Sequence, residues 1–216
     1  MERRFTSRQQ CRIERRAEGK AGMLVGYAAV YFDAQDVVGT QYPLWTGAVE
    51  RVMPGAFDRA IRERQDVRGL SNHNVDTIVG RTLAGTMRLS TDAVGLRYEI
   101  DLPETEAART LATAIERGDV SGSSFSFRTV SQNWRNERLA DGVTIEIREL
   151  LDVDLFDVGP VVFPAYESTT VATREAGELA EARAAYDEWN HASKLASPHR
   201  SRDAVTARAR AIAVGR

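Results

Sequence analysis

The amino-acid sequence predicts a mainly β fold with surrounding helices, of the α+β class. Two segments have the character of strands: Val25–Phe32 is rich in aromatic and β-branched residues, and Leu96–Leu102 alternates apolar with charged side chains. Helical spacing occurs in only two places before the C-terminal tail. With 216 residues, 43% of them hydrophobic, the chain can bury one sizeable core but is short for two full domains.

The two helices are predicted from apolar residues that recur at helical spacing. Pro54 opens a short helix in which Phe57, Ala60 and Ile61 lie on one face. A longer helix is expected over Thr105–Arg117, and the glycine that follows is a suitable C-terminal cap.

Three further strands complete the prediction. Val67–Leu70 forms a short one, and a hairpin joins Phe125–Trp134 to Val143–Leu151. Asp141-Gly142 is the hairpin-type turn between them. Strands therefore outnumber helices.

Composition divides the chain into three parts. Residues 1–22 are dominated by arginine and predict a flexible basic arm that orders only on a partner. A globular domain is expected over residues 23–171. Residues 172–216 predict a helical, partly disordered tail, whose apolar stripe either folds back on the domain or binds a partner as a tether; the stripe consists of Leu179, Ala182, Tyr186 and Trp189.

Charge and composition exclude several classes of protein. The formal net charge of -2 gives no sign of a nucleic-acid partner. Cys11 is the single cysteine, so the chain cannot form an intramolecular disulfide. One cysteine and three scattered histidines are also too few ligands for a structural zinc site. The longest apolar stretch, Met23–Phe32, is too short to span a membrane. We therefore expect a cytosolic protein with no cofactor and no metal.

One histidine and one serine-rich turn are the first candidates for chemistry. His73 follows the predicted strand Val67–Leu70, and Ser124 begins the strand of Phe125 and faces away from its aromatic side. A serine hydroxyl becomes a good nucleophile when a neighbouring imidazole takes its proton. The alternative is an ordinary polar loop and a flexible serine turn.

The apolar segment from Leu150 to Ala165 carries three carboxylates that need partners. In a regular strand Asp157 shares a face with Leu155, whereas Asp152 and Asp154 lie on the other face. A carboxylate on an apolar face is costly unless it is paired. The ring N–H of a catalytic histidine is one available partner for Asp157, and the side chain of Arg128 or Arg148 is another.

Seven short motifs in order resemble the prohead maturation proteases of tailed bacteriophages. The match spans Met23 to Val171. Its motifs are Gly26-Tyr27-Ala28, Met53-Pro54-Gly55-Ala56-Phe57, Asn72-His73-Asn74, Val79-Gly80-Arg81, Gly95-Leu96, Gly122-Ser123-Ser124-Phe125-Ser126-Phe127 and Phe163-Pro164-Ala165. The resemblance implies a fold related to the herpesvirus assemblins, a closed or nearly closed β-barrel with surrounding helices.

The resemblance also implies an activity, partners and a location. The chain would be a serine endopeptidase that cleaves scaffold or major capsid protein, and itself, during capsid maturation. It would act in the host cytoplasm, inside the assembling prohead and in contact with the prohead shell. We expect no cofactor, no nucleic-acid partner and no membrane contact. The chain could also form a homo-oligomer. The alternative is a non-catalytic capsid assembly or scaffolding protein that retains the protease fold.

Site residues follow from the family's Gly-x-Ser-x-Gly-Phe pattern. That pattern puts the nucleophile on Ser124, and because Ser126 stands where glycine is common, Ser123 and Ser126 remain open. His73 would be the general base. Assemblins use a second histidine as third triad member, but His191 and His199 both lie in the tail. A third member would then be an acid, and the resemblance points to Asp157, which occupies the place where the family pattern often has glutamate; Asp154 and Asp152 are the alternatives.

Overall fold

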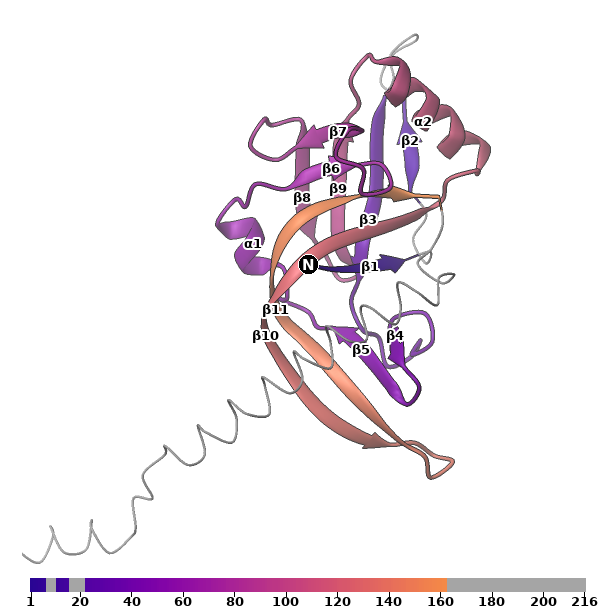
Figure 1. The fold of residues 1–216 in the computed structure, drawn as a ribbon, viewed down its shortest axis with the longest axis vertical. Helices are drawn as coiled ribbons and strands as arrows, with labels where there is room; N and C mark the ends of the chain where they lie inside the picture. Colours follow the sequence, from indigo (N-terminus) through magenta and orange to yellow (C-terminus); the bar gives the residue numbers. More distant parts are fainter. Residues whose placement is uncertain (7–10, 16–21, 163–216) are drawn as a thin grey trace, which may run out of the picture. The chain divides into compact units, whose positions relative to one another are not determined.

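The computed structural model describes residues 1–6, 11–15 and 22–162. The predicted tail over residues 172–216 lies outside the described residues. In chain order the elements are β1 (Glu2–Thr6), β2 (Arg12–Glu14), β3 (Met23–Val30), β4 (Tyr42–Trp45), β5 (Ala48–Val52), α1 (Asp58–Arg62), β6 (Arg68–Leu70), β7 (Ile78–Arg81), β8 (Met87–Thr91), β9 (Gly95–Asp101), α2 (Glu106–Arg117), β10 (Gly122–Arg138) and β11 (Thr144–Val161) (Figure 1). The mainly β class with a few helices is confirmed.

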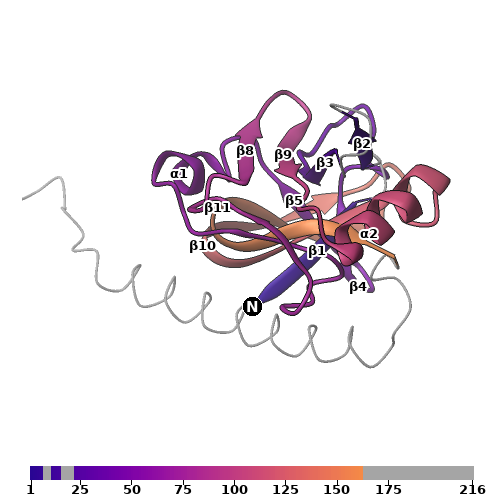
Figure 2. The same ribbon diagram turned by 90° about the horizontal axis from the view of Figure 1, so that it is seen from above.

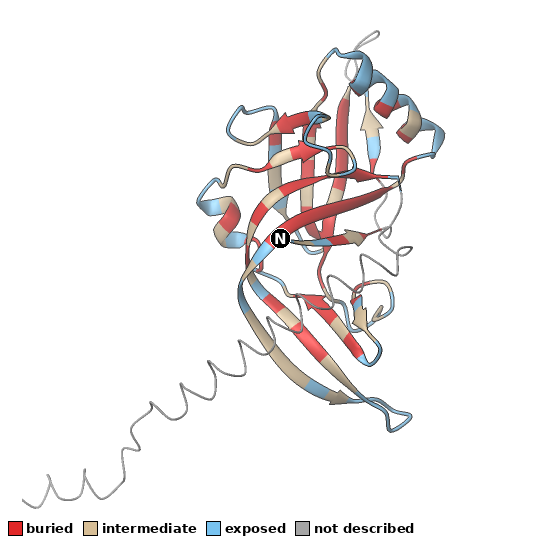
Figure 3. Cartoon of the chain, in the orientation of Figure 1, coloured by how far each residue is buried: buried red, intermediate tan, exposed pale blue. Residues whose placement is uncertain are grey.

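Two sheets form the fold and lie face to face as layers (Figure 2). The first has the order β1-β10-β11-β5-β4, with β6 paired to β11 and β7 to β6; the second has the order β2-β3-β9-β8. The long strands β10 and β11 pair with each other from Gly122 and Val161 to Arg138 and Thr144. The far end of this hairpin extends past the second sheet and is more exposed than the rest (Figure 3).

The core lies between the two sheets. Tyr98 and Ile100 reach it from the second sheet, and Phe125 and Phe127 from the first, all with no exposed surface. Phe57, at the start of α1, packs edge-on against Phe125 with ring centroids 5.7 Å apart. Burial of this kind stabilises a fold by roughly 25 cal/mol for each Å² of apolar surface removed from water.

The predicted closed or nearly closed barrel is wrong, because both sheets are open over the described residues. A barrel needs an unbroken ladder of paired strands, yet β1 and β4 are edges of the first sheet and β2 and β8 of the second. The sheets approach through single backbone hydrogen bonds, such as Cys11 N to Ser121 O (3.0 Å). On one edge of β11, β5 pairs near the start and β6 near the end, so the first sheet branches.

Both predicted helices are present, but the short one begins at Asp58 and not at Pro54, because Pro54–Phe57 forms a turn. In α2 the Thr105 side chain accepts a hydrogen bond from the Ala108 N–H, and Gly118 ends the helix with a φ of 82°. The short helix α1 begins at Asp58 and buries Ala60. Neither helix is both long and apolar enough to cross a bilayer.

Two described segments among the first 22 residues depart from the prediction of a flexible arm. Within them, Glu2–Thr6 forms β1 along β10, and Arg12–Glu14 forms β2 along β3. The prediction is wrong for these segments because an arginine-rich composition does not reveal cross-strand partners: the Arg4 side chain is buried in an ion pair with Glu50. The strands β4, β5, β7 and β8 were also not predicted.

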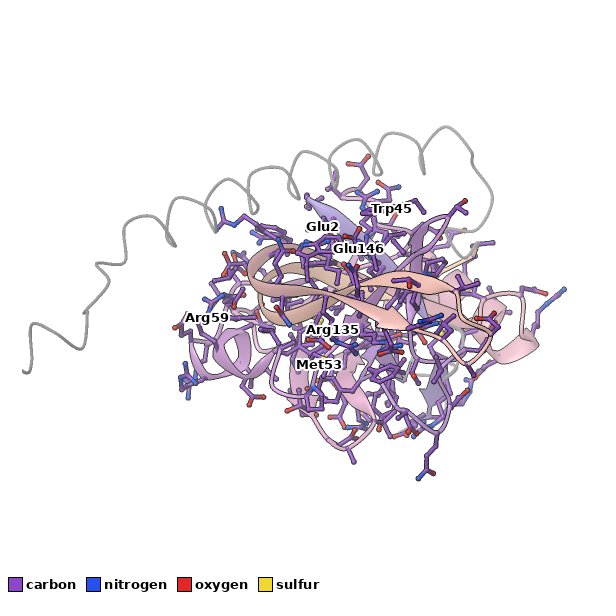
Figure 4. All side chains as sticks on the ribbon, turned by 90° about the horizontal axis from the view of Figure 1, so that it is seen from below. Glu2, Trp45, Met53, Arg59, Arg135 and Glu146 are labelled. Carbon is purple, nitrogen blue, oxygen red and sulfur yellow. The ribbon has the colours of Figure 1, made fainter. Side chains whose placement is uncertain are left out.

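Ion pairs attach helix α1 to β11, in the part of β11 that lies between its pairings with β5 and β6. Arg59 donates to Asp152 (2.8 Å) and Asp154 (2.6 Å), and Figure 4 labels Arg59 beside the sheet. Hydrogen bonds from Arg59 and then Arg128 lower the pKa of Asp154 to about 2. These two carboxylates therefore have structural partners.

We expect Asp154→Asn to lower the free energy of unfolding at neutral pH by roughly 1–2 kcal/mol. A lowered pKa contributes stability above the ordinary value of 3.8, and this contribution is lost as the pH falls toward about 2. The difference between the variant and the unchanged chain should therefore narrow below pH 4, as measured by denaturant unfolding across this range. Equal stabilities at neutral pH would contradict the pairing.

Candidate active site

The first five residues of strand β10 include three serines, which lie on alternating faces. Ser123 lies on the core face, where its hydroxyl is 2.8 Å from the Tyr98 hydroxyl. Ser124 and Ser126 lie on the opposite face, because successive strand side chains alternate. The predicted orientation of Ser124, away from Phe125, is confirmed.

An extra residue in β11 brings Asp157 to the same face as Ser124. Phe127 pairs with Leu155 and Ser126 pairs with Asp157, so Phe156 is left without a partner in the ladder. Such a bulge reverses which face the following residues occupy. The prediction that Asp157 shares a face with Leu155 is therefore wrong: Leu155 faces the core, and Asp157 faces away from it.

One side chain and one loop carbonyl replace the ladder where the edge of β11 lacks a strand. The Leu155 N–H, one residue before the bulge, donates to the side-chain oxygen of Gln65 (2.8 Å). The Val153 N–H donates to the Ala56 carbonyl (3.2 Å). The backbone groups beside the bulge thus have partners, as buried polar groups require.

His73 is positioned by β6, which runs parallel to β11. Gly69 pairs with Val158, and the chain then turns through Asn72 and His73, which have φ values of 54° and 55°. The Asn72 N–H donates to Pro160 O (2.9 Å), and its side-chain oxygen accepts from the Val162 N–H (2.8 Å). Left-handed backbone is unfavourable for most residues, so these bonds hold the turn in place.

The three predicted side chains meet in one row. The Nδ1 atom of His73 contacts Oδ1 of Asp157, and its Nε2 atom lies 2.6 Å from the Ser124 hydroxyl oxygen. When the neutral ring carries its proton on Nδ1, it donates to Asp157 and accepts from Ser124. All three side chains are largely shielded from solvent.

Ser126 completes the surroundings of Asp157. Its hydroxyl donates to Oδ2, the carboxylate oxygen that His73 does not use. The arginines that were alternative partners bind other acids: Arg128 pairs with Asp154, and Arg148 pairs with Glu50 and Glu2. Sequence reasoning considered Ser126 only as a nucleophile and missed this contact, because the pairing depends on the bulge.

The N-terminal strand supplies a neighbour that the sequence did not indicate. Strand β1 places Phe5 opposite Ser124, and the Ser124 hydroxyl lies 2.8 Å from the Arg4 carbonyl oxygen. Ser124 is consequently only 4% exposed.

The arrangement has the parts that acyl transfer requires. A hydroxyl beside an imidazole, itself oriented by a carboxylate, can be deprotonated as it attacks a carbonyl carbon. Over the residues with assigned positions, no cluster of three His, Cys, Asp or Glu side chains is arranged to hold a metal ion.

We expect Gly159→Ala to disturb this site through sterics alone. Gly159 pairs with Ser124, and an added Cβ would lie 2.0 Å from the Leu70 carbonyl oxygen, three residues before His73. Such overpacking commonly costs ~1–3 kcal/mol. Thermal unfolding should show a larger loss than Gly47→Ala, whose Cβ would meet nothing within 4 Å and whose φ of 83° alone is unfavourable. A melting temperature for Gly159→Ala equal to that of the unchanged chain would contradict the close approach.

The chain matches a known protein family. A family model described as caudovirus prohead serine protease matches residues 10–182, which is most of the chain. No curated protein and no solved structure matches significantly.

Proposed function

Because this chain belongs to the caudovirus prohead serine proteases, we propose that it is an endopeptidase in which Ser124 is the nucleophile. His73 is the general base and then the general acid, and Asp157 is the third member of the triad. The observation that carries this assignment is the continuous row of contacts from Asp157 through His73 to Ser124.

The first step is acylation. His73 Nε2 takes the hydroxyl proton as Ser124 Oγ attacks the carbonyl carbon of the peptide bond. The tetrahedral intermediate collapses, the C–N bond breaks, and the leaving amine takes the proton from Nε2. In the second step water loses a proton to Nε2 and attacks the ester, and Ser124 recovers its proton from His73.

Asp157 supports both steps from behind the imidazole. Its carboxylate accepts the Nδ1 proton, fixes the tautomer in which Nε2 is a base, and stabilises the imidazolium that forms. The hydrogen bond from Ser126 holds the second carboxylate oxygen. We therefore assign Ser126 a positioning role.

The substrates proposed are proteins of the assembling capsid. Family membership supports action on capsid-related proteins inside the prohead. We propose that scaffold or major capsid protein is cut, and that the chain also cuts itself. A non-catalytic assembly protein is the second candidate, but it would have no use for a buried row of three reactive groups at bonding distance.

Ser124→Ala should abolish cleavage of coat, scaffold and the chain itself, because the nucleophilic oxygen is lost while the strand remains. The measurement is gel and mass analysis of purified chain incubated with its coat and scaffold proteins. Ser123→Ala is the matched control and should cleave normally per folded molecule, since that hydroxyl bonds Tyr98. Full cleavage by Ser124→Ala, together with loss of cleavage in Ser123→Ala, would show that Ser123 is the nucleophile and that the assignment of Ser124 is wrong.

Asp157→Asn should fold but lose turnover by ~10³–10⁴-fold, because an amide favours the wrong imidazole tautomer. Turnover per folded molecule and the melting temperature are measured together. Asp154→Asn is the control, because its carboxylate pairs with Arg59 and Arg128, and it should lose stability but keep its turnover. An Asp157→Asn variant with full turnover would remove the acid from the mechanism and leave Ser124 and His73 unaffected.

A further inference from the structure

Strand β1 lies where it competes with His73 for the Ser124 proton. It is an edge strand of its sheet and pairs with β10 from Glu2 to Thr6. The Ser124 hydroxyl has one proton and two acceptors within reach, His73 Nε2 at 2.6 Å and the Arg4 carbonyl oxygen at 2.8 Å. A hydroxyl that donates to a backbone carbonyl is not donating to its base.

The side chain of Arg4 passes to the other face of the sheet and enters a built pocket. Its guanidinium donates to both carboxylate oxygens of Glu50, at 2.6 and 3.1 Å. It also lies 5.6 Å from the centre of the Phe127 ring. Glu50 has no exposed surface, and Arg4 has 6%. This two-pronged contact fits the planar fork of an arginine better than the point charge of a lysine.

A second pocket binds the acid that precedes Arg4 by two positions. Glu2 accepts from Arg148 and from the Thr129 hydroxyl (2.7 Å). Burial by itself raises the pKa of Glu2, but the bonds and charges of Arg148 and Arg4 outweigh it and lower the pKa. Residues two apart on a strand share a face. Glu2 and Arg4 therefore lie on the same face of β1, where Glu2 binds Arg148 and Arg4 binds Glu50.

These contacts belong to a strand at the edge of its sheet. An exposed strand edge binds an extended peptide through the same backbone bonds that it makes to its own chain, and side-chain pockets then set specificity. The buried charges of Glu50 and Arg148 need partners of opposite charge. A peptide with the charge pattern of β1 would supply them in place of the Glu2 and Arg4 side chains.

We propose that β1 occupies the substrate groove of this enzyme, and that a substrate replaces it as an extended strand along β10. The substrate carries arginine at the residue whose carbonyl reaches Ser124, held by Glu50, and an acidic residue two positions earlier, held by Arg148. Cleavage then follows the arginine: Ser124 Oγ bonds to the arginine carbonyl carbon, and the bond to the next nitrogen breaks. This inference rests on the proposed function.

The first test measures cleavage of matched peptides by the full chain. Peptides containing Glu-x-Arg should be cut after arginine at least tenfold faster than peptides with Gln in place of either charged residue. Each rate is compared with that of Ser124→Ala. Ser124-dependent cleavage without this preference would overturn the inference and leave the protease assignment intact. Failure to cut any peptide or any coat or scaffold protein would remove both.

The pocket is tested by Glu50→Gln, which should lose at least tenfold of the preference for arginine over glutamine in the substrate. Glu137→Gln is the control, because Glu137 also holds buried and half-buried arginines, Arg51 and Arg135, and it should keep that preference. Circular dichroism checks that both variants fold. A folded Glu50→Gln variant with unchanged preference would contradict the pocket.

Two further measurements use chains in which Glu50 is intact. Arg4→Met should release β1 and speed peptide cleavage, whereas Arg3→Met, which changes the exposed neighbour on the other face, should not. A hexapeptide with the sequence of residues 1–6 carries the same Glu-x-Arg pattern, so as a competing substrate it should inhibit cleavage of another peptide by the unchanged chain at least tenfold better than the same hexapeptide with Gln at positions 2 and 4. If Arg4→Met brings only a loss of stability and the two hexapeptides inhibit equally, β1 is a structural strand and the inference fails.

Discussion

Asp157 faces His73 because β11 carries one more residue than β10 between two successive pairs. Without Phe156 as the extra residue, strict alternation would turn the carboxylate toward the core beside Leu155, where an unpaired charge is costly. With the bulge, the Asp157 side chain lies beside Ser126, and the Val158 side chain packs in the core. It therefore places the acid outside the core and keeps the apolar packing continuous on both sides of the bulge.

The open edges of the two sheets have a functional consequence. A closed barrel would have no edge beside the nucleophile. Here β1 pairs with the edge of β10, and β6, which leads into the turn that carries His73, pairs with the edge of β11. The two hydrogen-bonding neighbours of the Ser124 hydroxyl, His73 and the Arg4 carbonyl oxygen, thus come from segments that join the long hairpin at its edges. On this account the site is assembled at the open edges of the sheet, and a substrate strand enters by the same route.

Local sequence signals predicted the parts of the fold that local physics decides. Thr105 and Gly118 define the ends of α2, and the alternation around Phe125 showed which way Ser124 points. The bulge at Phe156 could not be predicted, because it depends on the register of two distant strands. The order in β1 was missed for a similar reason: its stability comes from cross-strand ion pairs such as that of Arg4 with Glu50, which no local pattern reveals.

The central claim is that His73 activates Ser124 and no other serine of the turn. The most direct measurement is reaction of the full chain with a small fluorophosphonate, followed to completion, with the modified residue identified by mass spectrometry. The account predicts a single adduct on Ser124 that forms far more slowly in His73→Ala. An adduct on Ser123 or Ser126, or a Ser124 adduct that forms as fast without His73, would contradict it.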